Sequence, residues 1–78
     1  MLTIQYEADN VLEIFCDDEG RDRLVEVLGR LSVGDHDHLM TPAWGGYEIS
    51  EEFPVAGLTP IHKVTISLVA GPDDLPKA

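Results

Sequence analysis

Apolar and polar residues alternate at the start of the chain in the pattern of a β-hairpin. Leu2, Ile4 and Tyr6 alternate with polar residues, which is the period of two expected for a strand with one face on a core. A second apolar run covers residues 11–16 (VLEIFC), and its single charged side chain favours a central place in a sheet. Residues 8–10 (ADN) between the two runs are turn-tolerant. We therefore predict that the two runs form a hairpin.

The pattern changes to the helical period after the second run. Between residues 20 and 31, four apolar side chains recur on one face and four charged side chains occupy the opposite face. The apolar positions are Leu24, Val27, Leu28 and Leu31, and the charged positions are Asp22, Arg23, Glu26 and Arg30. The acidic run before them places an N-cap at Asp17 or Asp18. This segment is predicted to be an amphipathic helix packed on a sheet.

The second half of the chain contains shorter strand signals separated by turns. Residues 36–40 (HDHLM) alternate and are stopped by Pro42, and we predict another strand over residues 47–50, after the Gly-Gly turn. Residues 51–60 contain two prolines and a glycine, which predicts a loop or an irregular edge. The clearest alternation, over residues 63–68, predicts the final strand.

The resulting order of strand, strand, helix, strand, strand, strand predicts an α+β fold, with one amphipathic helix packed on a mostly antiparallel sheet. We expect a single domain over residues 1–70. Residues 71–78 (GPDDLPKA) contain two prolines and little apolar surface, which predicts a flexible C-terminal tail. Pro60 and Lys63 discourage the last strand from pairing with a second copy, so we expect a monomer.

The chain is strongly acidic, with 15 acidic and 5 basic residues among 78 and a formal net charge of -10. This charge disfavours binding to phosphate backbones and anionic lipids, so we expect neither nucleic acid nor a membrane as a partner. The same field attracts a basic protein surface and speeds its encounter. The alternative interpretation is that the charge only keeps a small protein soluble.

Cysteine content and the N-terminal sequence favour a reducing compartment. Cys16 is the single cysteine, so no intramolecular disulfide is possible. The start of the chain, MLTIQYEADN, lacks the basic region and the unbroken apolar run of a secretory signal. No segment reaches the roughly 20 apolar residues that a membrane helix needs. We therefore expect a cytoplasmic protein.

Three histidines suggest a metal site. His36 and His38 would share one face of an extended segment, and His62 would supply a third nitrogen. No fourth ligand accompanies them at recognisable spacing, and the alternative is that they pair with neighbouring acids or with the backbone. The chain contains neither a nucleophile motif nor a glycine-rich phosphate loop. We therefore expect no enzymatic activity, no catalytic residue and no cofactor.

Trp44 lies in the unusual segment PAWGGY and has two interpretations. It is either a plug over the sheet, which we favour from the sequence, or an anchor for a partner's pocket. As an anchor it would form an aromatic centre with Tyr47, rimmed by carboxylates and suited to a basic protein surface. The carboxylates are Asp35, Asp37, Glu48, Glu51 and Glu52. The predicted partner-binding residues are Trp44, Tyr47, Glu48, Asp35 and Asp37.

The segment HLMTPAWGGYEIS, residues 38–50, resembles the bacterial polymorphic-toxin immunity protein family 32. The specific part of the match is the run LMTP followed by WGG and a glutamate, while the hairpin, the D-x-E-G sequence and the Leu-rich helix match in layout. Ile49 stands where the family pattern leads us to expect leucine, a change that keeps the position apolar. The resemblance implies a small α+β protein that binds a bacterial toxin and blocks it.

We therefore expect an immunity-type binding protein that neutralises a cognate toxin by occluding it with an acidic surface. A nuclease, whose own basic cleft recognises phosphates, would suit such a surface. Two alternatives stay open. One is a small metal-binding protein that uses His36, His38 and His62, and the other is a nonenzymatic regulatory interaction module.

Overall fold

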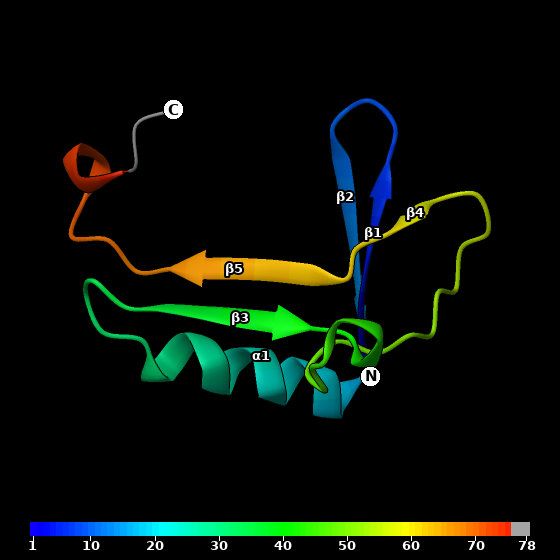
Figure 1. The fold of residues 1–78 in the computed structure, drawn as a ribbon, viewed down its shortest axis with the longest axis horizontal. Coiled ribbons are helices and arrows are strands. Elements are labelled where there is room, and N and C mark those ends of the chain that lie inside the picture. The colour runs from blue at the N-terminus through cyan, green and yellow to red at the C-terminus, as the bar shows by residue number, and fades with distance from the viewer. Residues whose placement is uncertain (76–78) are drawn as a thin grey trace.

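Residues 1–75 are described by the computed structural model, and within them the chain forms one α-helix, five strands and two short 3-10 turns (Figure 1). The strands are β1 (Leu2–Glu7), β2 (Val11–Cys16), β3 (His36–Met40), β4 (Thr59–Pro60) and β5 (Lys63–Ser67). The helix α1 is Asp18–Arg30, and the turns are η1 (Pro42–Trp44) and η2 (Pro72–Asp74). All strand pairs are antiparallel. The predicted α+β class and the order β-β-α-β-β-β are confirmed.

The strands divide between two sheets, one with the order β2-β1-β4 and the other formed by β3 and β5. In Figure 1, β3 and β5 run alongside α1, and the β1–β2 hairpin runs across the direction of these three elements. The loop after η1 returns to the free side of β1, where Ser50 donates a backbone hydrogen bond to Leu2 and Ile61 donates one to Ile4. The prediction that β2 is central is therefore wrong, because β1 is the strand with neighbours on both sides.

Both faces of β1 are covered, so its alternation does not correspond to one buried and one exposed face. Leu2, Thr3, Ile4 and Gln5 are all buried. The Gln5 side chain is held in the interior by two hydrogen bonds, donating to the Val55 carbonyl at 2.9 Å and accepting from the Val55 amide at 3.3 Å. A buried amide satisfied in this way costs little, so the polar face of β1 can be covered by the loop.

The helix begins and packs largely as its sequence predicts. Asp17 is the N-cap, and its side chain accepts a hydrogen bond from the Gly20 amide at 2.8 Å. Val27 is buried and Leu24 packs against the core from the same face. Leu28 departs from the prediction, because half of its surface is exposed, 50%. The helix therefore presents a narrower apolar stripe to the core than the sequence pattern indicates.

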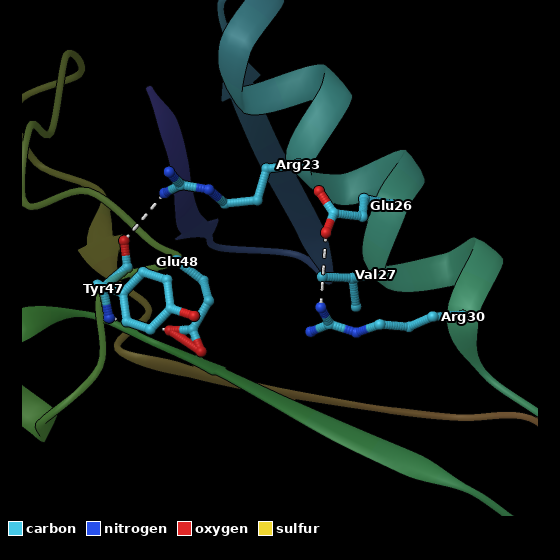
Figure 2. A pocket seen from close by; sticks show the side chains of 6 residues that line it. All are labelled: Arg23, Glu26, Val27, Arg30, Tyr47 and Glu48. Carbon is cyan, nitrogen blue, oxygen red and sulfur yellow. Dashed lines mark hydrogen bonds and ion pairs between the residues drawn. The ribbon is translucent and has the colours of Figure 1, made fainter.

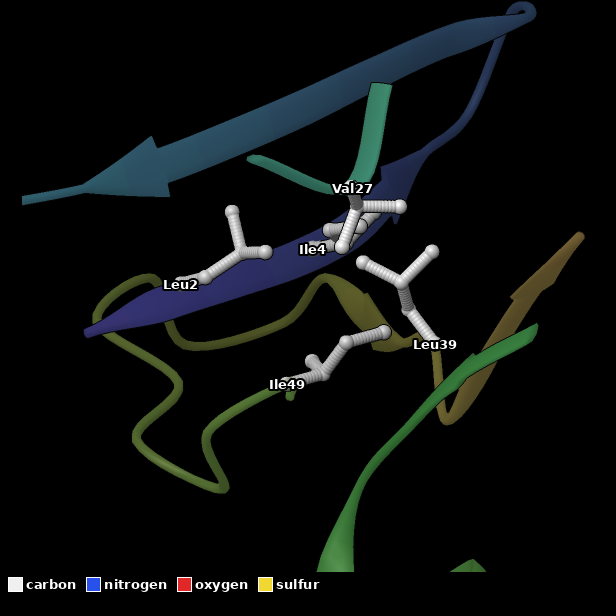
Figure 3. Close-up of a cluster of buried hydrophobic side chains, with 5 residues drawn as sticks. All are labelled: Leu2, Ile4, Val27, Leu39 and Ile49. Carbon is white, nitrogen blue, oxygen red and sulfur yellow. The ribbon is translucent and has the colours of Figure 1, made fainter. Parts of the chain in front are cut away.

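The buried core consists of Leu2 and Ile4 from β1, Val27 from α1, Leu39 from β3, and Ile49 (Figure 3). Ile49 is fully buried although it lies in the loop, and the strand predicted over residues 47–50 is absent from the described structure. The Ile49 amide bonds to the Met40 carbonyl at 3.3 Å, whereas the next amide bonds to β1. Successive residues thus join the two sheets, which is why they form no ladder of their own.

The C-terminal part follows its sequence pattern up to the end of β5. Val64 and Ile66 are half-buried against the core, and Leu68 lies beyond the strand and is exposed. The predicted tail, 71–78, contains η2, and residues 76–78 lie outside the described residues. Over residues 1–75, the one helix is too short to cross a membrane.

Candidate functional site

The Gly-Gly pair of the PAWGGY segment shapes a tight turn after β3. Gly45 ends η1 in the left-handed region, with φ of 87°, and its amide donates to the Pro42 carbonyl at 3.0 Å. Gly46 serves a different purpose, since a Cβ there would overlap the backbone of Met40. Its amide bonds to the Thr41 carbonyl at 3.0 Å. One glycine therefore turns the chain and the other lets the turn lie directly on the end of β3.

Trp44 is presented to solvent on this turn, with 59% of its surface exposed, so the plug interpretation is wrong. Its ring stacks on His62, with ring centroids 6.0 Å apart and planes 4° from parallel. His62 is itself held by Thr41, whose hydroxyl lies 2.7 Å from Nδ1, and by the edge-on ring of Phe53. Ile49, and not Trp44, is the core side chain of this segment, and the indole lies at the surface against the His62 ring.

Tyr47 is the second exposed aromatic side chain of the turn, with 76% of its surface accessible. The Arg23 guanidinium lies 5.8 Å from the ring centroid and donates a hydrogen bond of 3.0 Å to the Tyr47 carbonyl (Figure 2). Tyr47 is thus tied to α1 through a cation–π contact and a hydrogen bond. Trp44 stacks on His62 instead of on Tyr47, so the two aromatic rings are supported independently.

Glu48 stabilises the turn that carries these two aromatic residues. Its carboxylate accepts hydrogen bonds from the amides of Tyr47 at 2.9 Å and Met40 at 3.5 Å. Partial desolvation acts to raise the pKa of Glu48, but the bonds from backbone amides outweigh it and hold the pKa below its usual value. Glu51 stabilises the other side of the turn, where its carboxylate accepts a hydrogen bond of 2.6 Å from the Ala43 amide. Two acids that the sequence assigns to a partner-binding rim therefore also hold the loop.

A shallow cavity of about 240 Å³ lies between α1 and this turn (Figure 2). Its lining residues are Arg23, Glu26, Val27, Arg30, Tyr47 and Glu48. The four residues of α1 that line this cavity were not predicted from the sequence, because charged positions opposite an apolar stripe are usually solvated. The signal was the spacing: positions 23, 26, 27 and 30 follow the i, i+3, i+4, i+7 pattern of a single helix face.

Asp37 is paired with Arg30, one of the residues that line this cavity. Its carboxylate accepts a hydrogen bond of 2.8 Å from the Arg30 guanidinium, which also lies 3.8 Å from Glu26. That hydrogen bond, stronger than the opposing effect of desolvation, lowers the pKa of Asp37 and raises that of Arg30. The pair joins the C-terminal turn of α1 to β3, and it leaves little free charge on Asp37 for a partner.

The five predicted partner-binding residues do not all come together. Trp44, Tyr47 and Glu48 lie on the same turn. Asp37 is connected to this region by its hydrogen bond from Arg30. Asp35 lies at the opposite end of β3, where its carboxylate accepts from the Ser32 amide at 3.1 Å. A five-residue strand spans roughly 13 Å, which separates Asp35 from the aromatic residues.

The three histidines do not converge on one point. His36 and His38 are neighbours on β3, with ring centroids 4.9 Å apart, and His38 Nδ1 lies 2.9 Å from the Thr65 hydroxyl. His62 precedes β5, and its ring contacts the Thr41 hydroxyl and stacks on Trp44. Among residues 1–75, no group of three or more His, Cys, Asp or Glu side chains is placed to hold a metal ion. The metal-binding alternative therefore has no supporting geometry.

Comparison of the chain with models of known protein families, with curated proteins and with solved structures returns no match.

Proposed function

We propose that this chain is an immunity-type binding protein that neutralises a cognate bacterial toxin by occluding it. The observation that carries the proposal is the exposed pair Trp44 and Tyr47, at 59% and 76% exposure, on a turn fixed by hydrogen bonds. Tryptophan and tyrosine are the side chains most often found at the energetic centre of a protein interface. Exposed aromatic side chains grouped on one turn are typical of a surface that a partner protein covers.

The rigidity of the turn supports a role in binding. Glu48 and Glu51 bind backbone amides of the turn, His62 supports the indole, and Arg23 supports Tyr47. A side chain already held in place loses less conformational entropy when it is bound, which leaves more of the contact energy for affinity. The aromatic pair is therefore prepared for a pocket or groove on a partner before the partner arrives.

The charge of the molecule supports a partner with a basic surface. The formal charge is -10, and the two arginines of the cavity are already matched by carboxylates or carbonyls of the same chain. Such a field raises the encounter rate with a basic surface and repels phosphates. Within the proposal, the toxin is a nuclease with a basic cleft, and the two proteins meet in the cytoplasm.

The test is co-expression of this chain with the toxin encoded beside its gene. We expect wild-type protein to restore viability and to form a complex, and Trp44→Ala to weaken that complex by roughly 30-fold or more, as loss of about 2 kcal/mol implies. Circular dichroism would check that the variant is folded, and isothermal titration calorimetry would measure its affinity.

The matched control is Val33→Ala, which removes apolar surface from an equally exposed residue, 65%, on the turn before β3. Val33→Ala should leave the affinity within about twofold. If wild-type protein neither bound the toxin nor protected the cells, the immunity function would be rejected. The remaining alternative would then be a nonenzymatic regulatory interaction module. Equal losses for Trp44→Ala and Val33→Ala would reject the aromatic surface.

A further inference from the structure

The cavity between α1 and the turn that carries Trp44 and Tyr47, called the aromatic turn below, is large enough for one long side chain. Its volume is about 240 Å³, whereas pockets that enclose drug-sized molecules begin at about 300 Å³. Val27, which is buried, and the Tyr47 ring supply apolar surface, and the other four lining residues are charged (Figure 2). Such a lining suits a side chain that has an aliphatic stem and a charged end.

The two arginines that line the cavity are already engaged within the chain. Arg30 donates a hydrogen bond of 2.8 Å to Asp37. Arg23 donates one of 3.0 Å to the Tyr47 carbonyl and lies 3.7 Å from Glu19. An incoming carboxylate or phosphate would compete with these contacts for the same guanidinium groups, and it would approach a protein of charge -10. The cavity is therefore poorly suited to an anion.

The two carboxylates that line the cavity can accept further hydrogen bonds. Glu26 Oε1 lies 3.8 Å from the Arg30 guanidinium, which is too long for a hydrogen bond. The amides that bond to Glu48 both donate to Oε2, so Oε1 accepts no hydrogen bond from another residue within residues 1–75. Despite partial desolvation, these amides hold the pKa of Glu48 below its usual value, and the side chain is ionised at neutral pH.

The balance of charge at the cavity favours a cation. Four carboxylates line the cavity or pair with its two arginines, and they are those of Glu19, Glu26, Asp37 and Glu48. This excess of negative charge attracts a positive group. Tyr47 belongs both to the wall of the cavity and to the exposed surface of the aromatic turn, so a partner that covers this ring also reaches the cavity.

We infer that this cavity is the docking site for one lysine or arginine side chain of the basic partner. The aliphatic stem lies on Val27 and the Tyr47 ring, and the charged end bonds to the carboxylates of Glu26 and Glu48. Lysine and arginine share this chemistry, and the experiment below separates them. The inference rests on the proposed function, because it names a group on the toxin surface that the acidic protein recognises.

The experiment is an NMR titration of the full-length, ¹⁵N-labelled protein with single amino acids blocked at both ends by acetyl and methylamide groups. Blocked lysine and arginine are the cationic probes, and blocked norleucine and glutamate are the uncharged and acidic comparators. We expect a cationic probe to shift the backbone amide signals of Val27, Tyr47 and Glu48 with a Kd on the order of 1–10 mM. The comparators should leave these signals unchanged, and the tighter cationic probe identifies the preferred side chain.

Glu26→Gln removes one carboxylate of the cavity and should weaken binding of the cationic probe by about threefold. The matched control is Glu19→Gln. The Glu19 and Glu26 side chains are 80% and 75% exposed on α1, and each lies four positions before an arginine, at 3.7 and 3.8 Å, but only Glu26 lines the cavity. Both variants lose one negative charge, so a nonspecific attraction to the acidic surface would fall equally in both. Glu19→Gln should change the Kd by less than about 1.5-fold.

Several outcomes would overturn the inference. They are the absence of shifts with both cationic probes, equal binding of blocked norleucine, tighter binding of blocked glutamate, and equal losses in the two variants. None of these measurements needs the toxin. A protein that binds a cationic probe but no toxin would reject the proposed function and keep the cavity as a site for another basic partner. A protein that protects against the toxin but binds no cationic probe would reject the docking site alone.

Discussion

At the scale of single residues, the surface depends on contacts that glycine and a few carboxylates make possible. Gly46 lies against Met40 where no Cβ fits, whereas Gly29 on α1 has open space around its missing side chain. The sequence places Gly29 in the predicted helix and Gly46 in a turn, but it does not show which of them packs against another segment. The structure assigns one to close packing and the other to an exposed helix position.

Gly46→Ala and Gly29→Ala should therefore change stability in opposite directions. The first forces Met40 and the turn apart, and should lower the free energy of unfolding by about 1–3 kcal/mol. The second removes backbone freedom from an exposed helical site, and should raise it by up to about 1 kcal/mol. Urea unfolding followed by circular dichroism measures both. A Gly46→Ala protein as stable as wild type would show that the turn does not pack on β3 as described.

At the scale of elements, ionised carboxylates join one element of the chain to the next. Asp17 begins α1 and also pairs with the N-terminal ammonium, Asp37 links β3 to Arg30, and Glu48 links the turn to β3. All three pKa values are lowered in the folded protein. The causes are hydrogen bonds from the N-terminal ammonium and the Gly20 amide for Asp17, the Arg30 hydrogen bond for Asp37, and backbone amides that outweigh desolvation for Glu48.

Stability should fall as the pH is lowered through the carboxyl range. For a lowered pKa, the unfolded chain binds protons first, so the contribution is complete above the ordinary values of 3.8 for Asp and 4.5 for Glu. It is lost as the pH drops through the lower, folded values. We expect the urea midpoint to decrease steeply below about pH 4.5, and less steeply in Asp37→Asn. An identical acid profile for wild type and Asp37→Asn would remove Asp37 from this account.

At the scale of the whole molecule, the net charge of -10 bears on association with other molecules. In the proposed function, this charge attracts a basic toxin toward the turn that carries Trp44 and Tyr47. This attraction is electrostatic, so it depends on ionic strength.

Raising the salt concentration from about 20 mM to 500 mM should slow toxin association by about tenfold, because screening weakens the attraction between the two proteins. Stopped-flow fluorescence of Trp44 would follow the association. An association rate that does not respond to salt would exclude electrostatic steering.

Local sequence determined most of the elements. The hairpin, the N-cap at Asp17, the helix, β3 and the final strand all follow from alternation, helical spacing and capping, which act between residues close together in the chain. The acidic charge and the cluster of Trp44 and Tyr47 were also visible without a structure. These features predicted an aromatic centre for binding as one of two interpretations.

Only the tertiary structure decided which side chains are covered. The loop bonds to β1, which makes β1 central and leaves β2 at an edge, and Ile49 fills the interior in place of Trp44. Arg23 reaches Tyr47 across 24 positions of the sequence. Exposure and partnership depend on such long-range contacts, and a periodic pattern gives the face of an element without showing what covers it. The aromatic turn is therefore a property of the folded chain.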